Sequence, residues 1–190
     1  MIAGRLISWA AAQHGQRPSL VFRDRSHSHL EVEARSNRFA QALIALGLQP
    51  GERLAVLLEN SVESLDSLFG AEKAALTYVA LNARHTLAEH LEILADAQAS
   101  AVLVGPGFGE VASALAAAAG GKLPALRHVL GVGGVTPGVA DFGAACAAAA
   151  AEAPAIEIGP QHLVRIAYTS GTTGKPKGVA YTQARLQARL

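Results

Sequence analysis

Apolar residues follow two patterns along the chain: short continuous runs, and longer stretches in which they recur at helical spacing. The runs are typical of buried strands, and the spaced stretches are typical of helices that cover a sheet. The runs predict strands at 20–22, 54–58, 78–81, 101–104, 127–132 and 163–168. The spaced stretches predict helices at 2–13, 33–46, 62–75, 87–97, 111–119, 139–151 and 183–190. Because strands and helices alternate after residue 54, we predict an α/β fold with a parallel sheet of βαβ layers and flanking helices.

Several local signals refine this prediction. Residues 29–32 could return as the second strand of a hairpin with 20–22. Thr86 and Glu89 have the spacing of a capping box that begins a helix. Trp9 is expected to anchor the first helix in the core. The alanine-rich helix at 139–151, in contrast, is expected to pack lightly or to lie exposed.

The composition is that of a globular protein without a strong charge bias. The 190 residues are 51% hydrophobic with a net charge of +1, which suffices for one domain that buries about 70% of its unfolded surface. The lack of a basic stripe argues against a nucleic-acid partner. The single cysteine, Cys146, excludes an internal disulfide, is expected to be a small buried residue, and fits a cytoplasmic location. Without an apolar run of about 18 residues, no transmembrane segment is expected.

The stretch 169–178 carries the clearest chemistry. It reads Thr169, Ser170, Gly171, Thr172, Thr173, Gly174, Lys175, Pro176, Lys177 and Gly178. Glycines let backbone N–H groups turn toward an anion, hydroxyl groups add donors, and lysine adds positive charge. Two of the four lysines of the chain lie here, directly after a predicted strand. The sequence therefore predicts a loop that binds phosphate groups.

This loop is not of the Walker A type. That pattern requires a glycine five positions before Gly174, where the chain has Thr169. It also requires serine or threonine after the lysine, but Pro176 follows Lys175. We therefore expect phosphate binding with a different loop geometry.

Two other stretches suggest ligands only weakly. The glycines of 105–109 lack the third glycine of a dinucleotide fingerprint, because Glu110 takes its place, and we interpret them as a turn. His27 and His29 would share one face of a strand, but a metal site needs a third ligand and none is near in sequence. No dinucleotide site and no metal site are predicted.

Residues 168–179, YTSGTTGKPKGV, resemble the signature loop of the AMP-forming adenylating superfamily, which comprises acyl-CoA synthetases, luciferases and peptide-synthetase adenylation domains. Gly51-Glu52-Arg53 and Leu81-Asn82-Ala83 resemble two further segments of that family. Acyl-CoA synthetases tend to carry asparagine at the position of Asn82, which favours that branch. The resemblance implies that residues 1–190 are a partial AMP-binding N-terminal domain of the adenylating-enzyme fold, without the C-terminal domain.

The resemblance also implies an activity and its ligands. The parent enzyme would be a ligase that joins a carboxylic acid, expected to be a fatty acid, to CoA through an acyl-adenylate, with ATP and Mg²⁺. The residues implied to bind the ATP phosphates are Thr169, Ser170, Gly171, Thr172, Thr173, Gly174, Lys175 and Lys177. Gln183 departs from the family, in which many members carry a histidine that helps to orient the carboxylate.

Several family motifs have no counterpart in this sequence. They are an aromatic motif for adenine, a glutamate for magnesium, an aspartate for ribose and a C-terminal lysine for the reacting carboxylate. We therefore assign no catalytic residue and no metal ligand, and expect a fragment or a truncated gene product. Two alternatives stay open: a non-catalytic module that binds a nucleotide or a partner chain, and another adenylating enzyme similar to the peptide synthetases.

Overall fold

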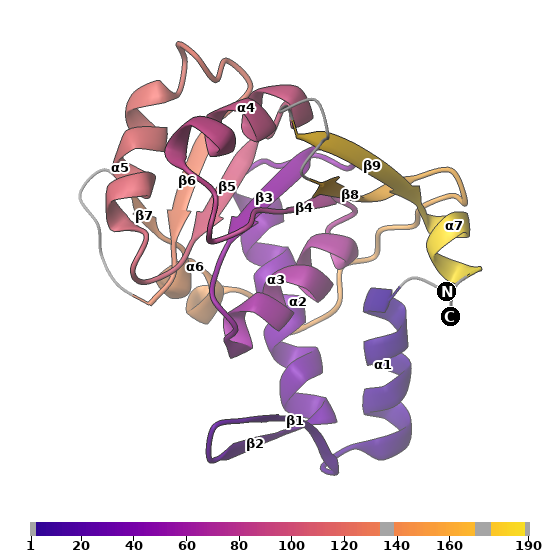
Figure 1. The fold of residues 1–190 in the computed structure, drawn as a ribbon. Coiled ribbons are helices and arrows are strands. Elements are labelled where there is room, and N and C mark those ends of the chain that lie inside the picture. The colour runs from indigo at the N-terminus through magenta and orange to yellow at the C-terminus, as the bar shows by residue number, and fades with distance from the viewer. Residues whose placement is uncertain (1–2, 134–138, 170–175, 189–190) are drawn as a thin grey trace.

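The computed structural model describes residues 3–133, 139–169 and 176–188. The strands are β1 (Pro18–Phe22), β2 (Arg25–Ser28), β3 (Arg53–Leu57), β4 (Thr77–Ala80), β5 (Ala101–Val104), β6 (His128–Gly131), β7 (Ala140–Asp141), β8 (Leu163–Thr169) and β9 (Lys177–Thr182). The helices are α1 (Ala3–His14), α2 (His29–Ala45), α3 (Val62–Lys73), α4 (Leu87–Ala97), α5 (Gly109–Ala118), α6 (Phe142–Ala148) and α7 (Gln183–Gln187). Figure 1 shows a central sheet with helices on both sides, and α1 and the β1–β2 hairpin at one end.

The central sheet is mainly parallel. Its strand order is β7-β6-β5-β3-β4-β8-β9, and every neighbouring pair is parallel except β8 and β9. The predicted α/β class with a parallel sheet is therefore confirmed. The edge strand β9 was not predicted, because its first four residues are exposed and it has no buried apolar run to mark it.

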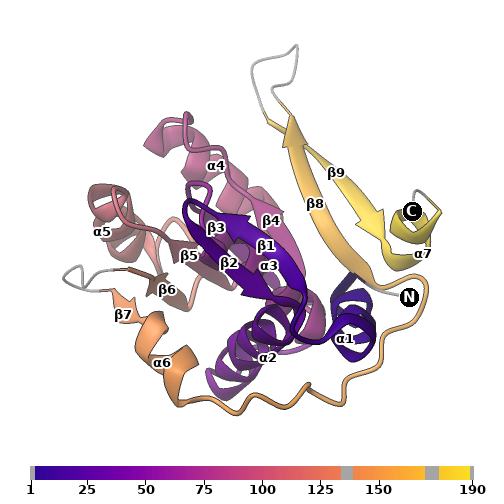
Figure 2. The ribbon, with the colours of Figure 1, turned by 90° about the horizontal axis from the view of Figure 1, so that it is seen from below.

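Residues of β3 alternate between two cores. Leu54 joins the core beneath α2, α3 and α6, and Ala55 joins the core beneath α4 and α5. Figure 2 shows these two groups of helices on opposite faces of the sheet. Since both faces are covered, residues 54–57 are all buried, which explains why the strand is a continuous apolar run in the sequence.

The hairpin near the N-terminus differs from the prediction. Its second strand is Arg25–Ser28, and His29 begins α2. The reason is a capping box: the Ser28 hydroxyl accepts from the Glu31 amide at 3.2 Å, and the Glu31 carboxylate accepts from the Ser28 amide at 2.7 Å. The prediction of a strand at 29–32 was wrong because this Ser-x-x-Glu signal was overlooked. The capping box of Thr86 and Glu89 is confirmed.

The prediction about Trp9 was also wrong. Trp9 is 51% exposed, and Ala11 is buried on the same helix, α1. The Trp9 ring lies edge to face against the His14 ring, with centroids 6.1 Å apart. The alanine-rich helix is shorter than predicted, Phe142–Ala148, but it is lightly packed as expected, since Phe142 is its one buried residue. Phe142, at 1% exposure, attaches the first turn of this helix to the core.

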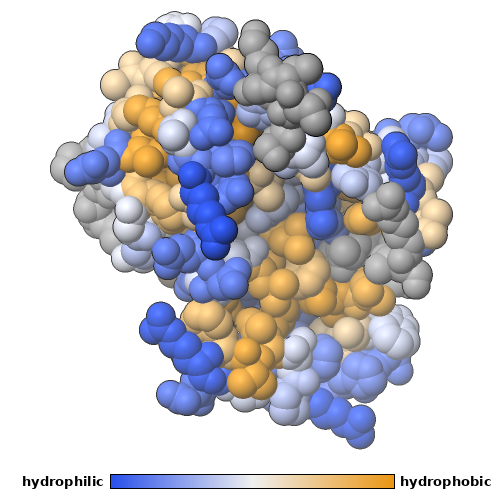
Figure 3. All heavy atoms as spheres, viewed as in Figure 1, coloured by the Kyte–Doolittle hydropathy of each residue, from blue (hydrophilic) through white to orange (hydrophobic). Residues whose placement is uncertain are grey.

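Several large apolar side chains remain exposed among the described residues. Figure 3 shows apolar side chains gathered over the middle of one face, where α2 and α3 lie in Figure 1. The large exposed apolar residues are Leu6, Trp9, Val21, Leu30, Leu87 and Val179. Apolar patches on a surface are typical of contact sites.

Within the described residues, no helix has the length and apolar character needed to cross a membrane.

Glu52 joins the turn before β3 to the segment before β6, and this contact predicts a dependence of stability on pH. Its carboxylate accepts from both terminal nitrogens of Arg127, at 2.8 and 2.7 Å. The Arg127 hydrogen bonds hold the pKa of Glu52 at about 2, below its usual 4.5. A lowered pKa stabilises the folded state above the unfolded pKa, and this contribution is lost as the pH falls through the folded value.

We therefore expect Glu52→Gln to lower the unfolding temperature at pH 7. The difference from the wild type should shrink as the pH falls from 4.5 toward 2. Thermal melts at a series of pH values measure this difference. A gap between the two proteins that stays constant over that range would contradict the linkage.

Candidate functional site

The parallel strands bring several loops to one edge of the sheet. β3, β4, β5, β6 and β8 run in the same direction, so the segments that follow them leave from the same edge. In open α/β sheets, ligands bind outside the carboxyl ends of the strands. β8 ends at Thr169, and the predicted phosphate-binding stretch therefore begins at this edge.

The structure places the two ends of the predicted loop side by side. Thr169, the last residue of β8, pairs with Lys177, the first residue of β9. Both residues are exposed. The other predicted phosphate ligands lie outside the described residues: Ser170, Gly171, Thr172, Thr173, Gly174 and Lys175. Their contacts with phosphate stay a prediction, and the described part of the site is the pair of strands that carries them.

The ends of β8 and β9 project beyond the rest of the sheet. The pairing of β8 with β4 ends at Ala167, opposite Ala80. Tyr168 and Thr169 continue without β4 and pair only with β9, opposite Gly178 and Lys177. Figure 2 shows the hairpin extending away from its neighbours at this end. The loop is therefore carried on a two-stranded arm.

Tyr168 ties this arm to helix α4. Its hydroxyl donates a hydrogen bond of 2.5 Å to Oδ2 of Asp96. Burial, together with this carboxylate, raises the pKa of Tyr168 above its usual value, so the phenol stays protonated and remains a donor. Sequence reasoning missed this contact, because Asp96 is one of three acidic residues on α4 and is 72 positions away from Tyr168.

Gly178 allows the aromatic ring to lie against β9. A Cβ atom at this position would lie 3.0 Å from Cζ of Tyr168 and 2.9 Å from Cγ2 of Ile166. Since Cβ contacts below 3.0 Å essentially never occur, the close approach of the two strands requires glycine here. The glycine is visible in the sequence, but its contact with Tyr168 can be identified only once the pairing of β8 with β9 is known.

A cavity of about 290 Å³ lies between the arm and α4. The residues that line it are Glu92, Ile93, Ala95, Asp96, Tyr168 and Pro176. Its two charged side chains are acidic, whereas Lys177 supplies positive charge at the start of β9. Among the described residues, no group of three or more histidine, cysteine or acidic side chains is placed to hold a metal ion.

Gln183 lies at the opposite end of the hairpin from the loop. Thr182, just before it, pairs with Leu163 at the start of β8, whereas Lys177 pairs with Thr169 at the end. In the orientation that satisfies its neighbours, the Gln183 amide donates to the carbonyl oxygens of Ile158 and Gly159, at 3.1 and 2.8 Å. This glutamine therefore fastens α7 to the segment before β8.

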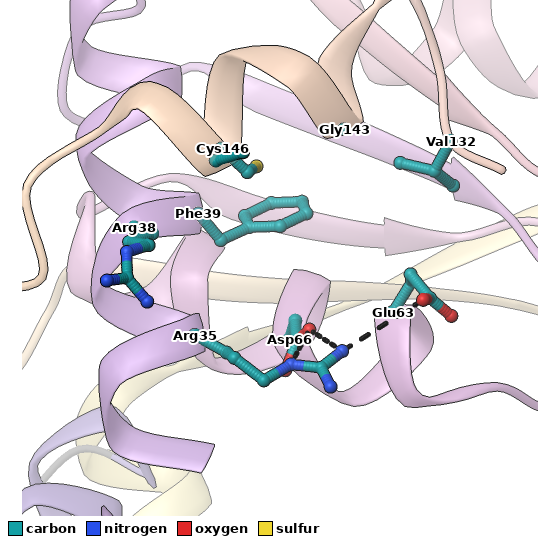
Figure 4. A pocket seen from close by; sticks show the side chains of 9 residues that line it. Arg35, Arg38, Phe39, Glu63, Asp66, Val132, Gly143 and Cys146 are labelled. Carbon is teal, nitrogen blue, oxygen red and sulfur yellow. Dashed lines mark hydrogen bonds and ion pairs between the residues drawn. The ribbon is translucent and has the colours of Figure 1, made fainter. Parts of the chain in front are cut away.

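A second cavity, of about 280 Å³, lies between α2, α3 and α6 (Figure 4). Arg35 crosses its rim and donates from Nε and Nη2 to Oδ2 of Asp66, at 2.9 and 2.5 Å. Burial raises the pKa of Asp66 to about 6, although the Arg35 charge opposes this. Burial also raises the pKa of the half-buried Cys146 thiol to about 12, which keeps it protonated and unreactive. None of the predicted ATP ligands that the structure describes lines this cavity.

Comparisons with known proteins agree with this fold. The model of the family "AMP-binding enzyme" matches residues 7–190. The long-chain-fatty-acid–CoA ligase FadD13 of Mycobacterium tuberculosis is 36% identical over 157 residues, 82% of this chain and 29% of that protein. The feruloyl-CoA synthase of an Amycolatopsis species is 35% identical over 159 residues, 84% of this chain and 29% of that protein. A crystal structure of the anthranilate CoA ligase AuaEII with anthranoyl-AMP superposes with a TM-score of 0.88 at 26% identity, covering 96% of this chain and 35% of that one.

These likenesses define the class of the fold as the N-terminal domain of an adenylating enzyme. The family model covers nearly the whole chain, and the chain belongs to the AMP-binding enzyme family. The resemblance drawn from residues 168–179 is thereby confirmed at the level of the family. The chain spans 29% of the length of the two relatives described above.

Proposed function

We propose that this chain supplies the ATP phosphate-binding part of an AMP-forming carboxylic acid–CoA ligase that acts on a fatty acid or a related acid. The observation that carries the proposal is that Thr169 and Lys177, the described ends of the predicted loop, pair with each other where β8 ends at the carboxyl edge of the parallel sheet. The proposal is also supported by the chain's membership of the AMP-binding enzyme family and by relatives that are named as CoA ligases or synthases. Residues 1–190 would then be the first part of the AMP-binding domain.

The proposed reaction explains why such a loop is needed. A carboxylate is a poor electrophile, so its oxygen first attacks the α-phosphorus of ATP, forming an acyl-adenylate and releasing pyrophosphate. The thiol of CoA then attacks the acyl carbon and AMP leaves. Negative charge builds on the departing pyrophosphate in the first step, and donors and cations fixed at that position stabilise the transition state.

In this proposal each part of the loop has a role. The hydroxyl groups of Thr169, Ser170, Thr172 and Thr173 donate to phosphate oxygens, together with the amides of Gly171 and Gly174. Lys175 and Lys177 offset the charge of the β- and γ-phosphates. Mg²⁺ enters as the complex with ATP. The adenine, ribose and acyl groups are assigned to no residue of this chain.

We expect Lys177→Ala to weaken the binding of MgATP about tenfold, the effect of losing one charge-assisted contact. Titration calorimetry with MgATP measures the change. Lys122→Ala is the matched control, because it removes the same charge from an exposed residue that does not belong to the hairpin. Equal affinities of the wild type and the Lys177 variant would remove Lys177 from the site.

A further inference from the structure

The end of the β8–β9 arm has one hydrogen-bonded tie to the body of the molecule among the described side chains, and it comes from α4. Pairing with β4 stops at Ala167, and β9 is the edge strand of the sheet. Beyond that point, the hydroxyl of Tyr168 binds the carboxylate of Asp96 at 2.5 Å. A two-stranded ribbon without further support is only marginally stable. The Asp96 contact therefore supports the arm at the position where the sheet no longer does.

The ring of Tyr168 also packs against β9, the second strand of the arm. Gly178 lies directly opposite Tyr168, and the position of its missing Cβ is 3.0 Å from the aromatic ring. Thr169 and Lys177, the next pair along the arm, flank the residues of the predicted phosphate loop. Fixing the ring of Tyr168 therefore fixes both strands one residue before the loop begins.

The charge of Asp96 argues for a role in geometry and not in direct binding. A carboxylate close to a triphosphate site repels the ligand, and a second acidic residue, Glu92, lines the same cavity one turn earlier on α4. Removing either charge alone should favour an anionic ligand slightly. If Asp96 instead acts by holding Tyr168, its replacement should weaken the binding of the anionic ligand.

We propose that Asp96 is a positioning residue for triphosphate binding, which acts by holding the Tyr168 hydroxyl and, through the ring of Tyr168, the paired residues Thr169 and Lys177. This inference rests on the proposed function, because it assigns a purpose to a contact next to the proposed ATP site. It adds a residue from α4 to a site whose other proposed members all belong to the β8–β9 hairpin and its loop.

The test compares four variants of the same chain. Asp96→Ala removes the acceptor, Asp96→Asn removes the charge but keeps a carbonyl acceptor, and Tyr168→Phe removes the donor. Glu92→Ala removes one negative charge from the same cavity without touching Tyr168. MgATP affinity is measured by calorimetry, exchange of the Thr169 and Lys177 amides by hydrogen-exchange mass spectrometry, and stability by thermal melts.

We expect Asp96→Ala and Tyr168→Phe each to weaken MgATP binding about tenfold and to speed exchange at the two amides. The double variant should be no weaker than either single variant, because both remove the same bond. Asp96→Asn should recover most of the affinity, and Glu92→Ala should bind as well as the wild type or better. A merely structural role of Asp96 would change the melting temperature and leave the affinity of the folded chain unchanged.

The outcomes separate the two proposals. If the wild type binds MgATP and Asp96→Ala binds equally well, the positioning role is overturned and the proposed function stands. If Glu92→Ala weakens binding as much as Asp96→Ala, the loss does not depend on the contact with Tyr168, and the positioning role is overturned as well. If the wild type does not bind MgATP, the proposed function fails and takes the ligand role of Asp96 with it. Amide exchange would then still show whether Asp96 holds the arm.

Discussion

Replacing Lys73 with methionine should lower the free energy of unfolding by about 3–5 kcal/mol, the cost of breaking a buried ion pair by removing one partner. Lys73 is 7% exposed. Its ammonium donates to the carboxylate of Glu33 at 2.6 Å, to the hydroxyl of Ser36 at 2.9 Å and to Oδ1 of Asn37 at 2.5 Å. Methionine fills a similar volume but leaves these three acceptors without their donor. Urea unfolding at pH 7 measures the loss.

The expected effect is large because the network of Lys73 joins four parts of the chain. Glu33 also accepts from the Ser8 hydroxyl of α1 at 2.8 Å. Asn37 donates to the carbonyl oxygen of Ala151 at 2.7 Å, which holds the segment that leads to β8. Burial lowers the pKa of Lys73, and the hydrogen bond and charge of the neighbouring Glu33 oppose that shift. The network thus fixes α1, α2, α3 and the start of the segment that leads to the β8–β9 arm.

Two further variants separate the ion pair from the packing around it. Lys122→Met changes an exposed lysine in the same way and should alter stability by less than about 0.5 kcal/mol. The double variant Lys73→Met with Glu33→Leu removes both charges and should be more stable than Lys73→Met alone, because the partly buried Glu33 carboxylate is then not left without its cation. If Lys73→Met alone were as stable as the wild type, the network would contribute nothing to stability.

The sheet could be predicted because its central strands are buried on both faces. Such strands are continuous apolar runs, as at 54–57 and 101–104, and their spacing leaves room only for helical crossovers. The edge strand β9 could not be predicted in this way. It begins with four exposed residues that include Lys177 and Gly178, and nothing in its own sequence distinguishes it from a polar loop.

The candidate site shows the same limit. The motif of residues 169–178 is local in sequence, so the family resemblance could be identified from it, whereas its contacts with phosphate stay a prediction. The contact of Asp96 with Tyr168 spans 72 positions, and that of Lys73 with Asn37 spans 36. Neither contact is marked by a pattern of neighbouring residues in the sequence. A single charged residue on a helix is usually solvated, so its presence alone does not indicate a partner. Only the folded chain shows which charged residues have a partner.

Phe142→Ala should lower the free energy of unfolding by about 3–5 kcal/mol, as expected for a large aromatic side chain removed from a core. Phe142 is 1% exposed, and its ring meets the Phe39 ring edge to face with centroids 4.8 Å apart. Phe39 in turn fills the space beside Gly70, where a Cβ atom would lie 2.5 Å from its ring. The two rings therefore join α6 to α2, and Phe39 lies tightly against α3 at Gly70.

The loss should be near the upper end of this range because the site cannot collapse easily. Gly143 and Cys146, on the same short helix, already line the cavity of about 280 Å³ beside Phe39, and truncation of Phe142 would enlarge the empty space next to it. Phe22→Ala is the matched control, since Phe22 lies in the small β1–β2 hairpin and is only partly buried; it should cost much less. Equal losses for the two variants in urea unfolding would mean that Phe142 does not hold α6 against the core.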